Sequence, residues 1–349
     1  MIFQIDNNNT SDPHVNLAIE ECVLRHLDPD RTYFLMYVNR PAVIVGRHQN
    51  ILEEVNLPFA ARHGLPVLRR ISGGGAVYHD CGNLNFSFIR HHDRRSLKDV
   101  SHILEPVRSA LLKLGVVAEF NHKNDLFVAG KKISGNAQFS NTKRIILHGT
   151  LLLNSDLVSL RRALQGNQGR IISRARQSVP SDVTNISDHL PSDIGMDVFQ
   201  QHLVECIAGR EGGLQKIPLP DREWNSVHRL SREKYRSWEW NFGRAPAFRI
   251  RRRSRTPAGY LETMIAVESG CIINIRFEKN INAIGHAAQL EKRLMGTPYH
   301  LDAIRTRLSG VDVRRFGTTL TANQLAEHLC DNGISGIGPG LQSARRILS

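Results

Sequence analysis

Cysteine is scarce in this sequence and irregularly spaced. The 349 residues contain five cysteines, an odd number, and no two of them have a CxxC spacing. Disulfide frameworks and structural zinc sites built on cysteine use paired cysteines at short, regular intervals. We therefore expect neither of them here, and we expect the thiols to be reduced.

Long apolar runs and targeting signals are also missing. A membrane-spanning helix needs about 18 or more consecutive apolar residues, whereas the hydrophobic 41% of this chain is spread along its length. The first residues, MIFQIDNNNTSDPHVN, lack the basic and apolar regions of a secretory signal and the Arg- and Ser-rich composition of a transit peptide. These absences predict a soluble, cytoplasmic protein without a membrane partner.

Acidic residues are outnumbered. There are 46 Lys and Arg against 33 Asp and Glu, a formal net charge of +13, and such a field attracts anionic ligands and acidic proteins. A basic nucleic-acid-binding protein is therefore one alternative. Aromatic residues make up only 6% of the chain, and no helix-turn-helix or RNP-like pattern accompanies them, so we expect no nucleic-acid partner.

The periodicity of apolar residues predicts a mixed α/β fold. Helices are expected over residues 13–27, 52–63 and 100–114, the first beginning at Asp12 and Pro13. Strands are expected over 33–38 and 42–46, as a hairpin, and over 117–120 and 145–153. In NLNFSFI the apolar residues alternate with Asn85 and Ser87, which predicts a strand with one core face and one polar face.

A second, smaller unit is expected after residue 249. Four arginines, at positions 251, 252, 253 and 255, indicate a linker or domain edge. Strands over 261–267 and 272–277 and helices over 287–294, 301–308 and 322–329 follow. We therefore predict a large mixed-sheet catalytic domain, residues 1–249, and a small C-terminal α/β accessory domain, residues 250–349.

The densest motif is RRISGGGAVYHD, residues 69–80. Three consecutive glycines let backbone approach a ligand closely, and consecutive N–H groups in such a turn can bind an anion. Arg70 adds a fork of donors suited to phosphate or carboxylate. The motif is neither a Walker A loop nor a GxGxxG fingerprint. Taken alone, it is also compatible with a tight hairpin whose glycines only permit positive φ.

Two further segments offer chemistry. KNDLFVAGKKISGNAQ, residues 123–138, is expected to turn at Ala129 and Gly130, with Lys132 projecting beside small residues. LHGTLL, residues 147–152, carries an imidazole, a glycine and a hydroxyl in an apolar strand. A lone lysine near a turn is usually solvated, and a lone histidine in a strand is usually a core residue.

Taken together, these segments resemble the lipoate-protein ligase A family. RRISGGGAVYHDCGNLNFSF, KNDLFVAGKKISGNAQ, LHGTLLLNSDL, SVPSDVTNIS and SWEWNFGRAPAF follow the motifs of that family in order and spacing, over residues 15–248. Tyr78 and Asn136 depart from the family pattern. In that family the glycine-rich segment is the lipoate-binding loop, and the lysine of the KIS strand contacts lipoate and phosphate.

The resemblance implies a set of site residues. Lys132 is the implied catalytic cation, and Asp125 is the candidate for placing Mg²⁺. The other residues implied to bind ATP or the lipoyl-adenylate are Arg70, Ser72, Gly73, Gly74, Gly75, Ala76, Val77, Tyr78, His79, Asn83, Asn124, Ser134, Gly135, His148, Gly149 and Thr150.

The implied activity is that of an ATP- and Mg²⁺-dependent ligase. It would activate lipoate as lipoyl-AMP and transfer the lipoyl group to a lysine of small, acidic acceptor domains, in 2-oxoacid dehydrogenase E2 subunits or glycine cleavage H protein. One alternative is an acyltransferase that uses a cysteine thioester, but no cysteine lies between Cys81 and Cys206. Another is a transferase fed with ready-made lipoyl nucleotide, and the extra C-terminal unit favours the full ligase. A biotin ligase is disfavoured because no DNA-binding segment precedes the SGGGAVYHD motif.

Overall fold

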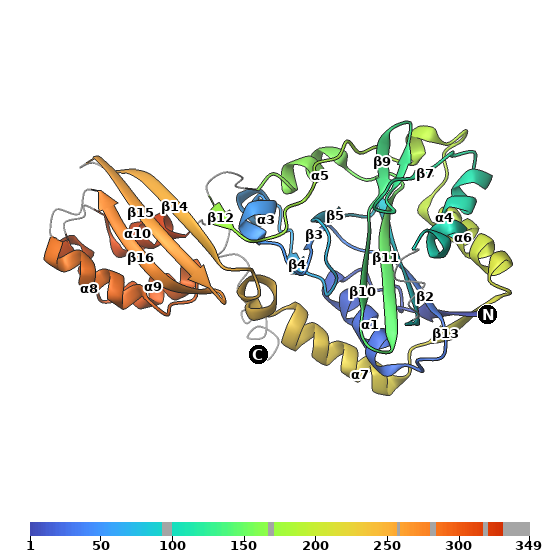
Figure 1. The fold of residues 1–349 in the computed structure, drawn as a ribbon, viewed down its shortest axis with the longest axis horizontal. Helices are drawn as coiled ribbons and strands as arrows, with labels where there is room; N and C mark the ends of the chain where they lie inside the picture. Colours follow the sequence, from blue (N-terminus) through green and yellow to red (C-terminus); the bar gives the residue numbers. More distant parts are fainter. Residues whose placement is uncertain (93–99, 167–170, 257–258, 280–283, 317–319, 331–349) are drawn as a thin grey trace, which may run out of the picture. The chain divides into compact units, whose positions relative to one another are not determined.

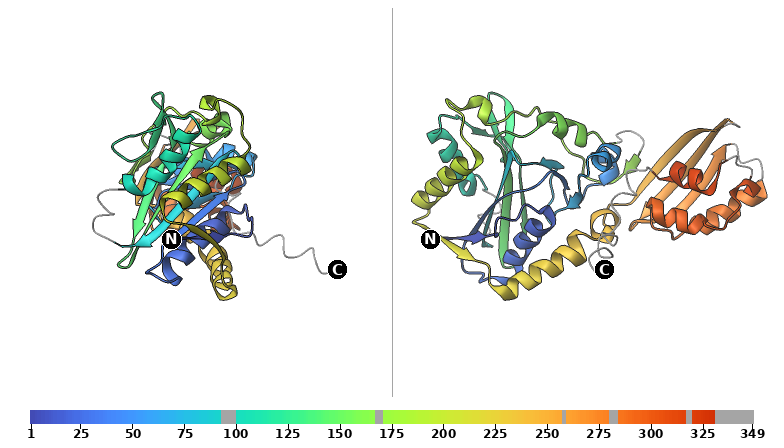
Figure 2. Two further views of the ribbon diagram at one scale, coloured as in Figure 1. Left: turned by 90° about the vertical axis from the view of Figure 1, so that its right-hand side faces the viewer. Right: turned by 180° about the vertical axis from the view of Figure 1, so that it is seen from behind.

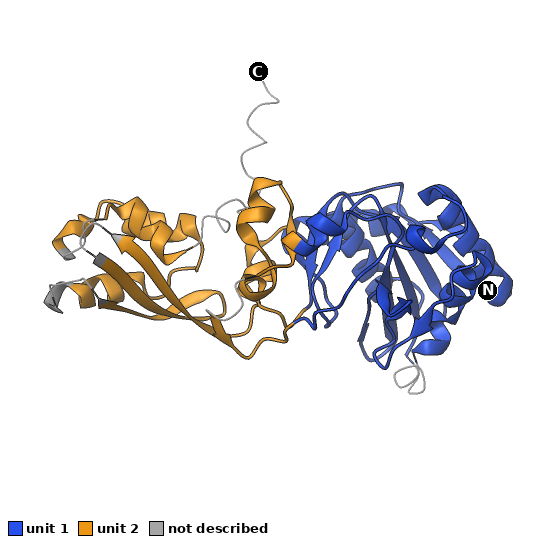
Figure 3. Ribbon diagram, turned by 90° about the horizontal axis from the view of Figure 1, so that it is seen from above, with its two compact units in different colours: residues 1–46, 68–161, 178–235 blue, residues 47–67, 162–177, 236–349 orange. Residues whose placement is uncertain are grey.

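The computed structural model describes residues 1–92, 100–166, 171–256, 259–279, 284–316 and 320–330. The chain divides into two compact units (Figure 3). The first comprises residues 1–46, 68–161 and 178–235, and the second comprises 47–67, 162–177 and 236–349. The second unit thus includes two short internal segments as well as the C-terminal part of the chain. A division at one point of the sequence, such as residue 249, does not describe this arrangement.

A six-stranded mixed sheet forms the centre of the first unit (Figure 1). Its order is β10-β11-β6-β2-β1-β13. β1 pairs in parallel with β2 and β13, and the other neighbours are antiparallel. The strands are β1 (Ile2–Asp6), β2 (Tyr33–Val38), β6 (Asn83–His91), β10 (Asn136–Ser140), β11 (Arg144–Leu152) and β13 (Leu214–Pro218).

Helices cover both faces of this sheet. α4 (Ser101–Lys113) and α6 (Met196–Arg210) pack together, and their apolar side chains join those of β6 and β11 in one core cluster. α1 (Pro13–His26) contacts β2, β6 and β11, and α7 (Asp221–Leu230) packs on α1. α1 begins where Asp12 accepts a hydrogen bond from the His14 N–H, with Pro13 at its first turn.

The alternation predicted for β6 is confirmed, but its polar face is not exposed to water. Phe86 and Phe88 lie in the core with α4 and α6, whereas the Ser87 hydroxyl donates to Glu20 of α1. Asn85 and Ser87 are both buried. The polar face of the strand is therefore an internal hydrogen-bonded layer, and this layer lies under the candidate site.

Two three-stranded sheets complete the first unit. One has the order β4-β3-β5, with β4 (Val67–Arg69), β3 (Ala42–Val45) and β5 (Val77–His79); the other comprises β7 (Glu119–Phe120), β8 (Leu126–Val128) and β9 (Lys131–Ser134). The remaining segments of regular structure are α5 (Leu157–Ala163), the 3-10 turn Ser187–His189 and the π-helical turn Ser231–Tyr235.

The second unit is built on a four-stranded antiparallel sheet, β12-β14-β15-β16. Helices α8 and α10 contact its strands, and α9 packs on α10 (Figure 2). Its elements are β12 (Ile171–Ser173), β14 (Phe248–Thr256), β15 (Gly259–Glu268), β16 (Cys271–Lys279), α2 (Ile51–Glu54), α3 (Leu57–Arg62), α8 (Ile284–Leu294), α9 (Leu301–Leu308), α10 (Ala322–Leu329), the π-helical turn Glu239–Gly243 and the 3-10 turn Val313–Phe316.

The mixed α/β fold class is confirmed, but three local predictions are wrong. β2 and β3 form no hairpin, because β2 lies in the six-stranded sheet and β3 in the β4-β3-β5 sheet. The Arg40 N–H bonds to Ser11 O, which holds the connection between β2 and β3 away from a tight turn. The arginine-rich stretch 251–255, predicted to be a linker or domain edge, lies within β14 and is therefore not a linker.

The helix predicted over residues 52–63 is two helices. α2 ends at Glu54, and α3 begins at Leu57 after Asn56 caps it by accepting from the Phe59 N–H at 3.1 Å. Pro58 accounts for the break, because in a continuous helix it would leave Glu54 O without its N–H donor. Within the described residues, no helix is long and apolar enough to span a lipid bilayer.

Candidate functional site

The glycine-rich loop between β4 and β5 is folded around the side chain of Arg70. Its Nη2 donates to Gly73 O at 2.5 Å and to Gly75 O at 2.8 Å, and its Nε donates to Ser72 Oγ at 2.9 Å. Nη1 donates to Ile44 O at 3.2 Å. Burial lowers the pKa of Arg70 to about 10, so the guanidinium remains charged at neutral pH. Four of the five donors of Arg70 are therefore engaged, three by the loop and one by β3.

The N–H groups of the loop are left for a ligand. Among the described residues, the N–H groups of Gly73, Gly74 and Gly75 have no protein acceptor, whereas the carbonyls of Gly73 and Gly75 face Arg70. The next N–H, that of Ala76, donates to Ser178 Oγ at 2.9 Å. A run of unpaired N–H groups stabilised from behind by a buried cation is an anion-binding arrangement.

The loop packs backbone to backbone against the end of β3. A Cβ added to Gly46 would lie 2.2 Å from Gly74 O, and Gly74 itself has φ +87°. Arg69, fully buried, donates from Nη1 to Gly46 O at 2.9 Å. In contrast, a Cβ added to Gly73 would meet no atom within 4 Å. Gly46 and Gly74 are thus required by the fold, whereas the space beside Gly73 is open.

A buried chain of polar side chains extends from the loop to α1. Ser72 Oγ lies 2.6 Å from His148 Nε2, and His148 Nδ1 lies 2.9 Å from Glu20 Oε2. Glu20 Oε1 accepts from the Tyr37 hydroxyl at 3.0 Å and from Ser87. Burial alone would raise the pKa of Glu20, but the charge of His148 and these hydrogen bonds hold the pKa below its usual range.

A second buried chain fixes His79. Asn39 Nδ2 lies 2.9 Å from His79 Nδ1, and Asn39 Oδ1 accepts from Asn16 Nδ2 at 2.8 Å. Burial, with the positive charges of Arg70 and His148, lowers the pKa of His79 to about 3. His79 is therefore neutral at physiological pH, and its Nδ1 accepts a hydrogen bond from Asn39 Nδ2.

Lys132 is held by one carboxylate. Its Nζ donates to Asp125 Oδ2 at 2.8 Å, with 25% of the lysine side chain exposed. The side chain lies against Gly135, where an added Cβ would be 3.2 Å from both Cε and Nζ. The Lys132 N–H donates to Asp182 O at 2.8 Å, which joins β9 to the segment after Ser178. The ammonium is thus fixed in position and remains accessible to solvent.

Gly135 marks the passage of the chain from one sheet to another. β9 pairs with β8, whereas β10 pairs with β11, so the two strands on either side of Gly135 lie in different sheets. Thr150 Oγ1 accepts from the Gly135 N–H at 3.3 Å. Asn136, opposite Gly149 in register, donates from Nδ2 to Asn124 O at 2.7 Å and to Ser134 Oγ at 3.3 Å.

Gly149 is required by close packing. A Cβ there would lie 2.0 Å from Asn136 Oδ1 and 2.7 Å from Phe86 Cζ. Asn136 Oδ1 is buried and has no hydrogen-bond partner among the described residues. The departure from the family pattern at position 136 is therefore accommodated by the absence of a side chain at Gly149.

The other predicted residues lie around β5 and the start of β6. Ala76 adjoins Ser178, and Val77 and Tyr78 pair with Ile44 and Val43 of β3. Burial raises the pKa of Tyr78 to about 12. Asn83 is buried, donates to Asn85 and leaves its Oδ1 without a described partner.

Asp125 does not fit a protein-held Mg²⁺ site. Its Oδ2 accepts from Lys132, and its Oδ1 accepts from the Asn136 N–H at 3.1 Å. Among the described residues, no group of three His, Cys, Asp or Glu side chains converges beside Lys132. Mg²⁺ prefers several oxygen ligands in octahedral geometry, so this carboxylate is suited to positioning the lysine rather than to holding a metal alone.

Several residues of this region were missed from the sequence. They are Glu20, Tyr37, Asn39, Gly46, Ser87, Ser178 and Asp182. Five of them contact a predicted residue directly, whereas Tyr37 and Ser87 bond to Glu20. Only the polar face of β6 carried a signal for one of them, since Ser87 alternates with the apolar residues of that strand. The others lie in distant segments that only the tertiary fold brings together.

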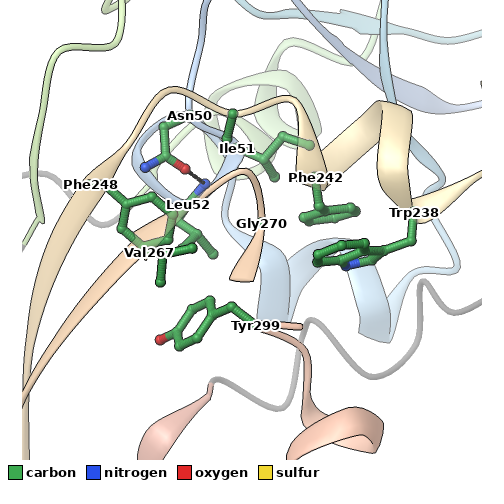
Figure 4. Close-up of a pocket in the computed structure, with 10 residues that line it drawn as sticks. Asn50, Ile51, Leu52, Trp238, Phe242, Phe248, Val267, Gly270 and Tyr299 are labelled. Atoms are coloured by element: carbon green, nitrogen blue, oxygen red, sulfur yellow. Dashed lines mark hydrogen bonds between the residues drawn. The ribbon is translucent and has the colours of Figure 1, made fainter. Parts of the chain in front are cut away.

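A separate small pocket lies within the second unit (Figure 4). It is lined mainly by apolar side chains, including Leu52, Trp238, Phe242 and Phe248. Asn50 Oδ1 accepts from the Leu52 N–H at 3.1 Å and so caps α2 at its rim. None of the predicted site residues lines this pocket.

Two family models match the chain. One, described as the lipoyl protein ligase A/B catalytic domain, matches residues 12–208. The other, described as the bacterial lipoate protein ligase C-terminus, matches residues 245–329. Together they cover most of both structural units.

Individual relatives agree with these matches. Lipoate-protein ligase LplJ of Bacillus subtilis (strain 168) is 40% identical over 323 residues, which are 92% of this chain and 97% of the relative. A crystal structure of lipoate-protein ligase A bound with ATP has a TM-score of 0.61 at 26% identity, covering 70% of this chain and 99% of that one. The bi-partite lipoate protein ligase of Thermoplasma acidophilum, studied with its E2 lipoyl domain, has a TM-score of 0.58 at 25% identity, covering 69% of this chain and 95% of that one.

Proposed function

The chain belongs to the lipoate-protein ligases of the lipoyl protein ligase A/B family, and from this premise we propose that it activates lipoate with ATP as lipoyl-adenylate. The lipoyl group then passes to a lysine of an acceptor lipoyl domain. The observation that carries this proposal is the pairing of an accessible, anchored cation, Lys132, with a loop whose glycine N–H groups have no protein acceptor.

The first step joins two anions. A lipoate carboxylate oxygen attacks the α-phosphorus of ATP, the bond to the bridging oxygen breaks, and pyrophosphate leaves with the bonding electrons. The carboxylate and the α-phosphate repel each other as they approach, and negative charge accumulates on the α-phosphate and the departing pyrophosphate in the transition state. Lys132 and the N–H groups of Gly73 to Gly75 offset this charge, and fixed donors do so without reorganising during the reaction.

The second step needs no nucleophile from the enzyme. The neutral amine of the acceptor lysine attacks the carbonyl carbon of the mixed anhydride, the carbon–oxygen bond to phosphate breaks, AMP leaves, and the amine proton passes to solvent. The same cation and N–H groups then stabilise the departing phosphate. In this proposal the same groups serve both steps.

The buried chain Ser72–His148–Glu20 has a supporting role. It connects the loop to α1 through contacts of 2.6 and 2.9 Å, and none of its members is more than 9% exposed. Groups held behind the residues that touch the ligand fix the geometry of a site. We assign these three residues to positioning the glycine-rich loop.

Cofactor and partner follow from the same proposal. A family relative is described as bound with ATP, and another is described together with its E2 lipoyl domain, which supports ATP and a lipoyl domain as the substrates here. Mg²⁺ stays a prediction, as an ion that the phosphates of ATP would bring with them, because Asp125 is already engaged by Lys132 and Asn136.

The proposal is tested by following both products with the full chain. With lipoate and MgATP, lipoyl-AMP should accumulate and be detected by chromatography and mass spectrometry. Addition of a lipoyl domain should then increase the mass of that domain by one lipoyl group at one lysine. Transfer from an acylated carrier without ATP, with no lipoyl-AMP formed, would instead support a transferase that uses a pre-activated donor.

A further inference from the structure

Near the C-terminal end of α1, three side-chain atoms of types that can bind a metal ion lie close together. Two belong to α1 and one belongs to α7. Cys22 and His26 are four residues apart on α1, and Glu223 lies in the first turn of α7, which packs along α1 (Figure 1). Cys22 Sγ is 3.6 Å from His26 Nδ1 and 3.4 Å from Glu223 Oε2, and His26 Nδ1 is 3.1 Å from Glu223 Oε2. The three atoms thus form a small triangle.

The edges of this triangle match one face of a zinc tetrahedron. With Zn–S near 2.3 Å and Zn–N or Zn–O near 2.0–2.2 Å, tetrahedral angles separate sulfur from nitrogen or oxygen by about 3.5 Å and nitrogen from oxygen by about 3.3 Å. The observed edges of 3.6, 3.4 and 3.1 Å are close to those values. An ion could therefore bind with little movement of the side chains.

We propose that Cys22, His26 and Glu223 form a zinc site that joins α1 to α7, with water as the fourth ligand. Sulfur, imidazole and carboxylate together favour zinc over magnesium or calcium. Access for the ion and the water comes from the side of His26, whose side chain is 35% exposed, whereas Cys22 is fully buried.

Binding exchanges a proton for a metal ion. Burial and the carboxylates of Glu223 and Glu21 raise the pKa of the Cys22 thiol to about 12, so without a cation the sulfur keeps its proton. When zinc binds, the S–H bond breaks, the Zn–S bond forms and the proton leaves to solvent. The positive charge of the ion also offsets the negative charge of the Glu223 carboxylate, which lies 3.4 Å from the sulfur.

The role of this site is structural. α1 carries Glu20, which bonds to His148, and Glu21, which accepts from Lys234 Nζ at 2.8 and 2.6 Å. A metal ion at the end of α1 would fix the helix that holds these two carboxylates. Because zinc binds the folded chain, it should raise the midpoint of thermal unfolding.

The test uses zinc and cobalt salts with the purified full-length chain. We expect one high-affinity zinc per chain by calorimetry, and Co²⁺ should give the thiolate charge-transfer band and visible bands of a four-coordinate site. Glu223→Gln and His26→Gln, at partly exposed positions, should each weaken zinc binding by at least about tenfold. Cys22→Ser should remove the charge-transfer band.

Cys206→Ser is the matched control. Cys206 and His202 form a second pair four residues apart on α6, with Sγ 3.6 Å from Nε2, but within the described part of the chain no third ligand joins them. This variant should keep zinc affinity, the cobalt spectrum and the zinc-dependent thermal shift. The proposal is overturned if the wild type binds no stoichiometric zinc, or if Glu223→Gln and His26→Gln bind it as tightly as Cys206→Ser does.

Discussion

Glu20 is the acceptor at the centre of the polar cluster beneath the glycine-rich loop. It receives hydrogen bonds from Tyr37 and Ser87 and faces His148, which in turn contacts Ser72. A buried carboxylate is stable only when its lone pairs are satisfied, and here each oxygen has a partner. This one side chain therefore connects the position of α1 to the shape of the loop.

Glu20→Gln should separate this role from general stability. The amide cannot accept as a charged group does, so the chain to Ser72 loosens, and we expect adenylation to fall by about tenfold or more. Glu21→Gln is the control, because Glu21 is an equally buried carboxylate on the same helix that bonds to Lys234 and Tyr235 instead. Both variants should lose about 1–3 kcal/mol of unfolding free energy in urea titrations. Equal adenylation by the two variants would contradict the assignment.

His79 should make folding sensitive to acid. Its pKa is about 3 in the folded chain against an ordinary 6.5, so below pH 6.5 the unfolded chain takes up a proton that the folded chain does not. Stability from this group is complete above pH 6.5 and is lost as the pH falls toward 3, by about 1.4 kcal/mol per pH unit. His79→Asn should reduce that slope in urea titrations between pH 6.5 and 5, whereas His122→Asn, at an exposed position, should not. An unchanged slope in His79→Asn would show that the ring titrates normally.

At the scale of elements, two glycines of the site serve different purposes. Gly46→Ala would drive a methyl group into Gly74 O at 2.2 Å, whereas Gly73→Ala adds a methyl group to open space. We expect Gly46→Ala to cost about 1–3 kcal/mol of unfolding free energy. Gly73→Ala should stay within about 0.5 kcal/mol of the wild type and yet bind lipoate more weakly, because its methyl group occupies space that the ligand needs. If Gly73→Ala binds lipoate with normal affinity, the three glycines serve only to form the turn and do not contact the ligand.

Local pattern was sufficient where one helix or strand buries one face. The helix over residues 100–114 and the hairpin at Ala129 and Gly130 were predicted within a few residues, as were β15, β16, α8, α9 and α10 of the C-terminal unit. The apparent hairpin of residues 33–46 was not, because two short apolar strands joined by a turn-like segment have the same pattern whether they pair or enter different sheets. Between these strands Asn39 bonds to Asn16 of α1 and to His79 of β5, and these partners from distant parts of the sequence hold the connection in a conformation other than a hairpin turn.

The site itself was predictable only as a set of motifs. Lys132 and the glycine run stand out by residue type. Of the groups that hold them, Asp125 and Arg70 are close in sequence, but the others lie in α1, β2 and the segment that begins at Ser178. Arg70 is an example. Its residue type suggested that its N–H donors bind a ligand, but in the fold most of these donors bond to the glycine-rich loop itself. Residue type identifies candidate chemistry, whereas the three-dimensional partners decide which groups remain free for a ligand.

At the scale of the whole molecule, the positive charge is shared between the two parts of the chain. Residues 250–349 carry 14 Lys and Arg against 8 Asp and Glu, which is +6 of the total +13. Such a distributed field raises the encounter rate with acidic partners and is screened by salt. We infer that it steers acidic acceptor domains toward the ligase.

Steering predicts different salt dependence for the two half-reactions. Transfer to an acidic lipoyl domain should slow as the Debye length falls to about 10 Å near 0.1 M salt, whereas adenylate formation should change little. The comparison is a salt series with one acidic lipoyl domain and a charge-neutralised copy of it. If both acceptors give the same salt slope, the basic surface has no part in recruiting them.

Lipoate-dependent exchange of labelled pyrophosphate into ATP tests most directly whether Lys132 and the glycine-rich loop form the adenylate. The wild type should catalyse exchange, Lys132→Ala should lose about 10²–10³-fold of it, and Lys131→Ala, an exposed neighbour on the same strand, should retain most of it. Circular dichroism and unfolding midpoints should be alike in both variants. Absence of exchange in the wild type, with intact transfer from synthetic lipoyl-AMP, would contradict the account, as would equal loss of exchange in the two lysine variants.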